Sequence, residues 1–363
     1  MVSSDNKQKP RNAAGRSQYR TQEPPNAVQI ELAEGCNLRC TFCGLSGIRE
    51  QKEHDFKFMD AATLSVFVEE MVQANWNPRI EFAMHGEPTM HPDPAKMVGL
   101  VRALSPGWSI MMTSNGGGLL KKPGPVHNIS ALFAAGLNVL ALDDYEGANI
   151  VPKIRDALAR DWSGHDHSGP TIYEYPRDTV GNPHTRRRPG DKHLVFIQDI
   201  GAAKTGTHSS LNNHAGAGAP PLDAPLAARC AKPFRELSVR WDGRVAVCCN
   251  DWRGAYQCGS VVHDGVEAVW NGPAMGAARR MLYHSNRDFG PCTGCDAKSH
   301  RVGLLPDKYG RETLPRPNKQ TKVDIEAALS RGNLTVPVLR PWELEGTSEL
   351  EDKPEGKAAK AHA

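Results

Sequence analysis

Three cysteines stand within eight residues near the start of the chain, Cys36, Cys40 and Cys43, in the spacing C-x3-C-x2-C. They directly follow the apolar alternation at residues 28–32, which predicts a β-strand, so the three thiols lie on the loop that leaves this strand. A tight loop can aim three thiolates at one cuboidal iron–sulfur cluster, in which each iron takes a cysteine ligand. Three protein ligands leave one iron open, and an open iron can bind a substrate or a cofactor.

A zinc site or a set of buried thiols is the alternative interpretation of this loop. Zinc-binding loops usually use the C-x2-C spacing and need a fourth ligand nearby. The closest candidate, His54, lies eleven residues after Cys43. The spacing therefore favours the iron–sulfur cluster.

The stretch Cys36-Asn37-Leu38-Arg39-Cys40-Thr41-Phe42-Cys43 resembles the signature of the radical S-adenosylmethionine (radical SAM) enzymes. The resemblance implies that the three cysteines hold a 4Fe–4S cluster, and that S-adenosylmethionine chelates the open iron through its amino and carboxylate groups. It also implies that Phe42, the aromatic residue before the third cysteine, lies by the adenine.

The composition argues against several other classes of protein. A net charge of +3 with 23% charged residues gives no strong attraction to nucleic acid or to a membrane surface, and no apolar run approaches the length of a membrane span. The first twenty residues lack the apolar stretch of a secretion signal. Nine cysteines without such a signal indicate the reducing cytoplasm, where clustered thiols are metal ligands rather than disulfides.

Strands and helices alternate from residue 28 onward. Asp60 is a suitable N-cap for a helix whose apolar residues fall on one face, namely Leu64, Phe67, Val68, Met71 and Val72. Such alternation predicts a parallel sheet with right-handed crossovers. The expected strands are 28–34, 79–88, 108–117, 138–147, 171–175 and 193–200, and the later helices are expected at 94–104, 128–137 and 150–160.

Six such units resemble the partial barrel of the radical SAM enzymes. The expected fold is therefore α/β, a partial (β/α)6 barrel followed by a small β-hairpin and helix domain of the SPASM or twitch type. In such barrels the active site lies at the C-terminal ends of the strands, where the cysteine loop and the three following loops are expected. The expected division is a disordered tail at 1–26, the barrel at 27–200, a linker at 201–229, an auxiliary cluster domain at 230–300 and an extended tail at 301–363.

His85-Gly86-Glu87-Pro88 resembles the Gly-Gly-Glu-Pro motif of the family, with His85 in place of the first glycine. The resemblance implies that backbone carbonyls of this loop and the Glu87 side chain hydrogen-bond the amino group of the methionine moiety. A cation needs acceptors, and Gly86 allows the backbone to come close. An ordinary Gly-Pro turn is the alternative, and the histidine leaves open whether position 85 touches the cofactor.

Two later loops are also predicted to bind the cofactor. Ser114 and Asn115 belong to a segment that resembles the Thr-Asn-Gly end of the family's third strand. Asp143-Asp144 occupies the place of a ribose-contacting residue, and an aspartate can accept hydrogen bonds from both ribose hydroxyls. Either aspartate could instead cap a helix or lie in solvent. Asp143 is preferred because it is closer to the end of the strand.

A second set of cysteines surrounds the clearest predicted β-hairpin, residues 234–251, whose turn is Asp242-Gly243. Four thiols suit a four-cysteine cluster site, and they are Cys230, Cys248, Cys292 and Cys295. The spacing C-x12-G-x4-C from Cys230 to Cys248 resembles the opening of the SPASM and twitch extensions of radical SAM enzymes. Because the set ends at Cys295, it resembles the shorter twitch form, which holds one auxiliary 4Fe–4S cluster.

Alternatives stay open at this second site. A structural zinc ion would also accept four thiolates with these spacings, and Cys249 or Cys258 could replace one of the four ligands. Adjacent cysteines on a strand point to opposite faces, so only one of Cys248 and Cys249 should ligate. The glycine spacing favours Cys248, which leaves Cys249 and Cys258 as buried thiols or substrate-side residues.

Two segments outside these motifs also carry polar residues of interest. The arginine run at 186–188 could grip a phosphate or carboxylate, although a solvated loop is the commoner role for such a run. The segment at 212–216 resembles a polar segment of some relatives that could face the substrate.

The resemblance implies reductive cleavage of S-adenosylmethionine to methionine and a 5′-deoxyadenosyl radical, which abstracts hydrogen from a substrate carbon. The predicted task is peptide or protein modification. The alternative is a twitch-type dehydrogenase of a sugar, aminoglycoside or nucleotide-like alcohol, and the contrasting class is a non-catalytic iron–sulfur or zinc protein. The two cofactor loops argue against this last class, because a carrier has no need of a cofactor cleft. Expected partners are a peptide or small-molecule substrate and an electron donor such as flavodoxin or ferredoxin.

Overall fold

The computed structural model describes residues 23–45, 56–145, 147–161, 170–174, 192–197 and 212–297, together with the backbone of two short strands, β12 (Leu305–Pro306) and β13 (Glu312–Thr313). The arginine run at 186–188, residues 1–22 and nearly all of the C-terminal tail lie outside the described residues. The expectations for these segments therefore stay predictions.

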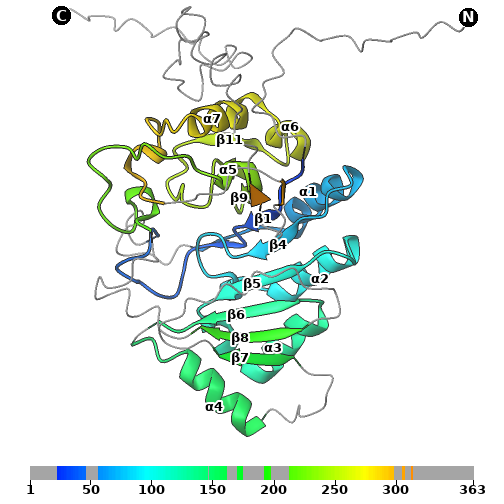
Figure 1. Cartoon of the computed structure of the whole chain (residues 1–363). Helices are drawn as coiled ribbons and strands as arrows, with labels where there is room; N and C mark the ends of the chain where they lie inside the picture. Colours follow the sequence, from blue (N-terminus) through cyan, green and yellow to red (C-terminus); the bar gives the residue numbers. More distant parts are fainter. Residues whose placement is uncertain are drawn as a thin grey trace, which may run out of the picture.

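One nine-stranded sheet forms the centre of the molecule (Figure 1), in the strand order β11-β10-β9-β1-β4-β5-β6-β8-β7. The six strands expected for the barrel are neighbours in this sheet and run parallel, which confirms the expected partial barrel. They are β1 (Ala27–Ile30), β4 (Arg79–Phe82), β5 (Ile110–Ser114), β6 (Val139–Asp143), β7 (Thr171–Glu174) and β8 (His193–Ile197).

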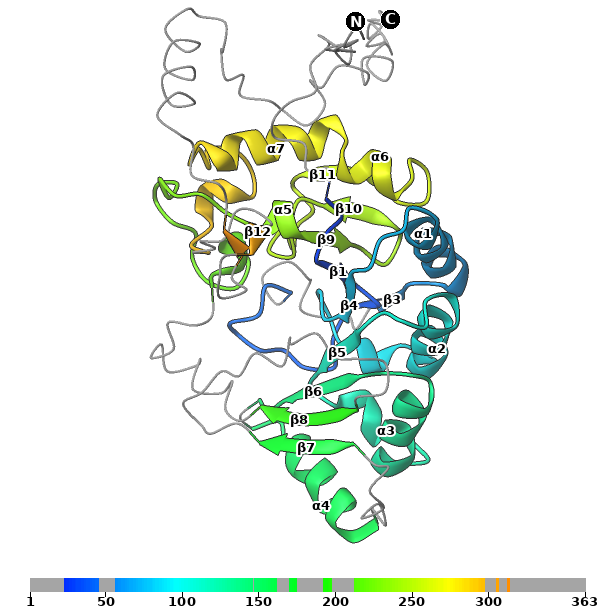
Figure 2. The same cartoon turned by 45° about the vertical axis from the view of Figure 1, so that its right-hand side comes forward.

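Four helices cover one face of the parallel strands. They are α1 (Ala61–Gln73), α2 (Pro94–Leu104), α3 (Pro125–Ala134) and α4 (Val151–Asp161). Figure 2 shows α1, α2 and α3 along the right-hand side of the molecule and α4 at its lower end. Asp60 caps α1 as predicted, because its Oδ1 accepts a hydrogen bond from the Thr63 amide at 2.6 Å. The predicted apolar face is buried apart from its last member, Val72, which is 42% exposed.

The apolar residues separate onto the two faces of this sheet. The larger core lies between the strands and the helices and includes Ile80, Phe82 and Phe67. A small cluster on the other face contains Met111, Val139, Ala141, Val195 and Ile197. Both sides of β6 and β8 are thus buried, as is usual for strands of a parallel sheet.

The last two parallel strands do not follow chain order. β8 pairs with β6, and β7 pairs with β8 at the edge of the sheet. All five residues of β8 are buried, whereas all four residues of β7 are exposed. The more apolar strand therefore takes the inner position.

The C-terminal cysteine region continues the same sheet. Strands β9 (Glu236–Val239) and β10 (Arg244–Ala246) form the predicted hairpin, and Gly243 adopts φ +83° in its turn. β11 (Gln257–Ser260) pairs with β10, and β9 pairs in parallel with β1. The boundaries expected at residues 200 and 230 stay predictions, since the main sheet spans both parts. The helices of this region are α5 (Lys232–Arg235), α6 (Val266–Trp270) and α7 (Pro273–Tyr283).

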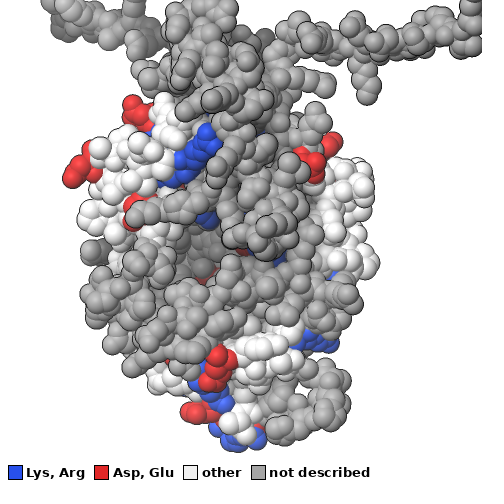
Figure 3. All heavy atoms as spheres, in the orientation of Figure 1, with Lys and Arg blue, Asp and Glu red and all other residues white. Residues whose placement is uncertain are grey.

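Short elements complete the described chain. They are the two-stranded sheet of β2 (Ala33–Glu34) and β3 (Lys57–Phe58) and the 3-10 turns η1 (Pro88–Met90), η2 (Gly117–Leu120), η4 (His214–Gly216) and η5 (Cys292–Gly294). Within the described ranges, no helix has the length and apolar character needed to span a membrane. On the face drawn in Figure 3, the visible acidic and basic side chains are interspersed.

Candidate active site

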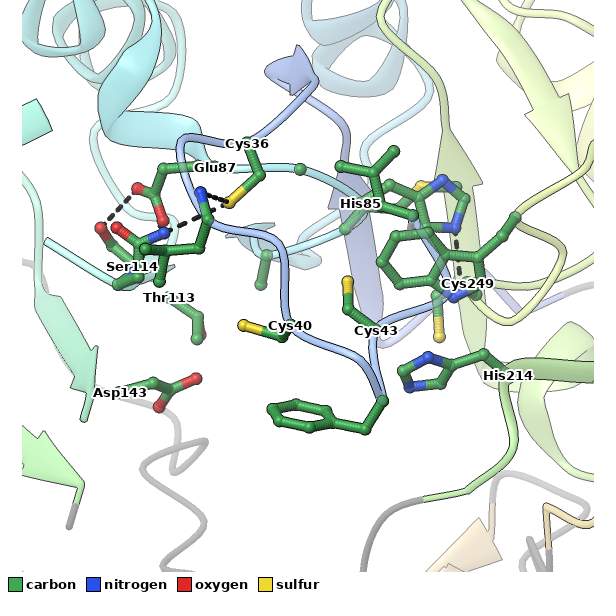
Figure 4. A pocket seen from close by; sticks show the side chains of 18 of the residues that line it. Cys36, Cys40, Cys43, His85, Glu87, Thr113, Ser114, Asp143, His214 and Cys249 are labelled. Carbon is green, nitrogen blue, oxygen red and sulfur yellow. Dashed lines mark hydrogen bonds between the residues drawn. The ribbon is translucent and has the colours of Figure 1, made fainter. Parts of the chain in front are cut away.

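A cavity of about 280 Å³ opens at the C-terminal ends of β1, β4, β5 and β6. The loops that follow these four strands all line it, as expected for a barrel of this kind. Figure 4 shows the cysteine loop crossing the cavity, with Glu87 and Asp143 on one side and His85, His214 and Cys249 on the other. The cavity therefore lies between the barrel loops and the C-terminal cysteine region.

The three N-terminal cysteines all line this cavity and are half-buried. The Cys43 amide donates to the Cys40 carbonyl at 3.1 Å, which tightens the loop. Cys36 Sγ accepts hydrogen bonds from the Leu38 amide and from Asn115 Nδ2, both at 3.3 Å. Burial, and then the nearby Glu87 carboxylate, raise the pKa of Cys36 to about 12. Iron must therefore displace the Cys36 proton when it binds, as metals do at thiol sites.

Gly86 brings the second loop against the first. Its φ is +76°, and a Cβ atom at this position would lie 1.9 Å from the Ala33 carbonyl oxygen. The next amide, that of Glu87, donates to the Gly35 carbonyl at 2.9 Å. Only glycine fits this contact, which holds the Glu87 loop beside the entrance to the cysteine loop.

The Glu87 carboxylate is fully engaged by protein donors. Its Oε1 accepts from the Thr89 amide at 2.9 Å, from the Thr89 hydroxyl at 2.6 Å and from the Ser114 hydroxyl at 2.5 Å. Its Oε2 accepts from the Asn115 amide at 2.7 Å. Burial raises the pKa of Glu87, and these hydrogen bonds oppose that rise. Glu87 thus joins the loops after β4 and β5, and its predicted contact with a cofactor amino group stays a prediction.

Replacing Glu87 by alanine should weaken S-adenosylmethionine binding by about 1–3 kcal/mol, the usual cost of losing hydrogen bonds to a charged group. The physical reason is that four donors on two cavity loops lose their common acceptor. Equilibrium binding to the anaerobic protein measures the change. Glu81→Gln is the matched control, because Glu81 is a buried carboxylate of β4 that pairs with Arg79 away from the cavity. Equal affinity in the Glu87 variant and the wild type would mean that this loop is only a turn.

The remaining predicted cofactor residues are distributed around the same cavity. Phe42, Ser114, Asn115 and Asp143 all line it. The Ser114 hydroxyl donates a hydrogen bond to Glu87, whereas the Asn115 side-chain amide donates to Cys36 in the cysteine loop. Pro88 starts the turn η1 and is buried without lining the cavity. Asp143 is the last residue of β6 and lines the cavity, and its preference over Asp144 as the ribose contact stays a prediction.

Asp143 has an unusual electrostatic environment. Burial, and then the negative charge of Glu87, raise its pKa to about 7, although a hydrogen bond from Tyr145 opposes this rise. The Tyr145 ring stacks on Phe42 with a centroid distance of 6.1 Å and an interplanar angle of 14°. An aromatic pair beside an aspartate can accommodate a base and a ribose, which is the role that the sequence predicts for Phe42 and Asp143.

Asp143→Asn should flatten the pH dependence of stability in the cluster-free protein. An unfolded Asp143 ionises near its ordinary pKa of 3.8, whereas the folded one holds its proton up to about 7. Between these values the folded state binds more protons, so stability falls as pH rises, by about 4 kcal/mol at most. Urea unfolding at about pH 5 and about pH 8 measures this loss, which the asparagine variant should lack. An identical loss in both proteins would contradict the assignment.

The far wall of the cavity comes from the C-terminal region and from η4. His214 accepts a hydrogen bond from the Gly44 amide at Nδ1, at 3.0 Å, directly after the last cysteine of the loop. Burial, and then the neighbouring His85, lower the pKa of His214 to about 4, so the ring is neutral near pH 7 and can accept. The polar segment at 212–216 therefore reaches the cavity.

The second cysteine set is buried as a group. Cys230, Cys248, Cys292 and Cys295 are each at most 7% exposed. Burial, and then the charges of Cys249, Cys292 and Cys230, raise the pKa of Cys248 well above its usual value. Burial raises the pKa of Cys258 to about 12, and its charged neighbours are Arg279 and Asp251 instead. This difference supports Cys248 over Cys258 as a member of the set.

Cys249 faces the cavity. Its Sγ accepts a hydrogen bond from Lys232 Nζ at 3.1 Å, and Lys232 also pairs with Glu236. The two adjacent cysteines thus have different surroundings. Strand alternation does not explain this difference, because β10 ends at Ala246 and both cysteines lie in the turn that follows it. Among the residues the structure describes, no three His, Cys, Asp or Glu side chains converge closely enough to hold one metal ion.

Comparison with known protein families explains this arrangement. The family model of the radical SAM superfamily matches residues 30–150, and that of the SPASM iron–sulfur cluster-binding domain matches residues 230–296. The chain carries a radical SAM domain followed by a SPASM domain. The two matched ranges contain the two cysteine sets that line or adjoin the cavity.

Two solved structures of BtrN share the fold of this chain. BtrN in complex with AdoMet and 2-DOIA has a TM-score of 0.57 at 19% identity, covering 77% of this chain and 96% of BtrN. SeMet BtrN in an open conformation has a TM-score of 0.52 at 17% identity, with coverage of 77% and 96%. AnSMEcpe with bound AdoMet has a TM-score of 0.43 at 16% identity, with coverage of 86% and 96%. No curated protein sequence matched significantly.

The radical SAM domain implies a 4Fe–4S cluster and S-adenosylmethionine, and the SPASM domain implies an auxiliary iron–sulfur cluster. The described residues fit these groups. Three half-buried thiols on one short loop face a cavity. The four buried thiols of the SPASM range lie close enough for their charges to interact, although they do not converge on one point in this structure. Thiolates are the ligands that iron–sulfur clusters take from proteins.

Several cavity residues escaped the sequence-based predictions. Trp252, Tyr145 and Asn250 were not selected at all, and Cys249 was expected only as a buried thiol, a substrate-side residue or a substitute ligand. The sequence signal for Cys249, Asn250 and Trp252 was their position directly after Cys248, on the segment that leaves the hairpin. Tyr145 lies two residues after Asp143, so it could have been selected with that loop.

Proposed function

We propose that this protein reductively cleaves S-adenosylmethionine and abstracts a hydrogen atom from a carbon of a substrate held between two iron–sulfur sites. The observation that carries the proposal is the composition of one cavity. Cys36, Cys40 and Cys43 line it from the barrel side, and the segment that directly follows Cys248 lines it from the SPASM side. A molecule in this cavity meets both cysteine regions.

Each wall has a definite role in this proposal. Cys36, Cys40 and Cys43 would hold the 4Fe–4S cluster, and Cys230, Cys248, Cys292 and Cys295 the auxiliary cluster. When bound, these clusters and S-adenosylmethionine would supply a 5′-deoxyadenosyl radical and an acceptor for the electron left on the substrate.

The protein's own residues would bind, orient and enclose the reactants. Gly86, Asn115 and Asp143 shape the cofactor side, where Glu87 fixes two loops by its four hydrogen bonds. Phe42 and Tyr145 offer aromatic faces, and Trp252 with His214 closes the opposite side. Such walls exclude water from a reactive radical.

Peptide or protein modification is the first candidate for the task, as predicted from the sequence. A second candidate is the oxidation of an alcohol carbon in a small polar molecule. One observation favours this second class: the chain shares its fold with BtrN, whose structure contains 2-DOIA. An external reductant such as flavodoxin or ferredoxin would supply the electron for cofactor cleavage.

The decisive experiment measures 5′-deoxyadenosine released from S-adenosylmethionine by the anaerobically reconstituted protein under strong reductant. Release is expected, and its absence in protein with full iron content would refute the proposal. Candidate substrates labelled with deuterium at carbon then separate the two classes, because deuterium should pass into 5′-deoxyadenosine only from the true substrate. A short precursor peptide encoded beside the gene would favour peptide modification.

A further inference from the structure

His85 is a buried histidine at the edge of the cofactor loop, where the resembling motif has glycine. It is 3% exposed, and both of its ring nitrogens have partners. A large polar ring in place of glycine must be accommodated by its surroundings. Those surroundings belong mostly to the SPASM side of the molecule.

The two nitrogens of His85 bind two different parts of the fold. Nε2 lies 2.9 Å from the Cys249 carbonyl oxygen, and Nδ1 lies 3.0 Å from Glu31 Oε1. A carbonyl can only accept, so Nε2 carries a hydrogen. The contact of Nδ1 with the Glu31 carboxylate is the second buried polar contact of the ring.

Glu31 extends this contact to the hairpin. The residue directly follows β1 and is fully buried. Its Oε2 accepts from the Trp241 amide at 3.2 Å and pairs with Arg240 Nε at 3.3 Å, both in the turn between β9 and β10. One buried carboxylate therefore connects the β4 loop with the SPASM hairpin.

Trp252 adds an apolar contact between the same parts. Its ring lies 4.2 Å from the His85 ring and 5.1 Å from the His214 ring, measured between centroids. Gly44, which directly follows Cys43, packs closely against the Trp252 indole, because a Cβ atom on Gly44 would lie 2.6 Å from that ring. Trp252 thus packs on the cysteine loop, the His85 loop and η4 together.

We propose that His85 is a positioning residue that fixes segment 249–252, the cavity wall next to Cys248, against the cofactor loop. It acts through the backbone of Cys249 and the face of Trp252, while Glu31 holds its ring in place. His85 is then the direct side-chain link between the cofactor loop and the segment that follows Cys248. The claim that His85 positions segment 249–252 depends only on these contacts. The claim that this position affects a cluster rests on the proposed auxiliary site.

Hydrogen–deuterium exchange of the reconstituted protein tests this role without substrate. The reporters are the amides of Asp251 and Gly254, which bond within the turn, and those of Ala255 and Tyr256, which bond the Asp251 carboxylate. His85→Gly should speed their exchange by about tenfold or more, as expected for losing a hydrogen bond of a charged group. His85→Gln keeps a donor for the Cys249 carbonyl and should exchange at an intermediate rate.

His91→Gln is the matched control. His91 is also buried, six residues further along, and its ring bonds the Met59 carbonyl and the Asp93 amide within the barrel. Its substitution should leave exchange at 249–256 at the wild-type rate. Unchanged exchange there in His85→Gly would overturn the proposal, and so would an equal increase throughout the barrel strands.

A spectroscopic measurement adds a second readout. In a chain that lacks Cys36, Cys40 and Cys43, only the second cluster can contribute to the electron paramagnetic resonance spectrum. His85→Gly in this background should shift or broaden that signal, whereas His91→Gln should not. An unaltered signal would overturn the claim that His85 influences the auxiliary cluster. Absence of any signal in the parent variant would instead refute the auxiliary cluster, while the exchange measurement still decides the role of His85.

Discussion

A chain in which Cys36, Cys40 and Cys43 are all alanine should release no 5′-deoxyadenosine from S-adenosylmethionine, while its second cluster remains. The three thiols are the side chains proposed to hold the first cluster, and all three face the cavity. Their loss removes the open iron to which the cofactor would bind. The variant should keep about half of the wild-type iron if each site holds one four-iron cluster.

The measurement combines iron analysis with product detection under strong reductant in the absence of air. Cys258→Ala is a suitable control, since Cys258 is a buried thiol of β11 that does not line the cavity. It should keep both its iron and its activity. Persistent cofactor cleavage in the triple alanine variant would contradict the assignment of the first cluster.

Cys248→Ala should remove the iron of the auxiliary cluster, which is about half of the total if each site holds four irons. Cys248 is buried, and burial together with the neighbouring Cys292 and Cys230 raises its pKa. Cys295 in turn acts on Cys230 and Cys292, so the four thiols form one electrostatic neighbourhood. Without Cys248 the auxiliary cluster has three protein ligands and should be lost or strongly destabilised. Turnover of a substrate should fall more than uncoupled cofactor cleavage, because the radical would be generated at the other site.

Two further variants identify the ligands. Cys258→Ala should leave the iron content unchanged, and Cys249→Ala should do the same because its thiol bonds Lys232 at the cavity wall. A structural zinc ion would give about four irons and about one zinc in the wild type, and Cys248→Ala would then release zinc alone. Loss of iron from Cys249→Ala but not from Cys248→Ala would show that the wrong neighbour was chosen.

The sequence predicted best those features that depend on residues close together in the chain. Asp242-Gly243 predicted the hairpin turn correctly, because a turn that needs positive φ favours glycine. Asp60 predicted the start of α1, and the apolar residues 64–71 predicted its buried face. The four cavity loops were also expected together, since parallel strands place their following loops at one edge.

Tertiary contacts explain what the sequence could not show. Glu87 was predicted to face the cofactor, yet in the structure its carboxylate accepts from four protein donors. Two of these donors belong to Ser114 and Asn115, which lie near Glu87 only after folding. The exchange of β7 and β8 depends on which strand buries more surface. His85 and Trp252 are 167 positions apart in the numbering, so no local pattern could reveal their contact.

The parallel pairing of β1 with β9 has a consequence for how the chain can fold. Ala27 through Ile30 align with Glu236 through Val239, so a central strand made early in synthesis waits for a partner made late. Until then one edge of β1 has open backbone donors and acceptors, which favour intermolecular association. The cost of closing such a long loop also slows folding. A chain that ends before β9 should therefore form an aggregation-prone sheet with an unpaired edge at β1, and not a smaller independent barrel.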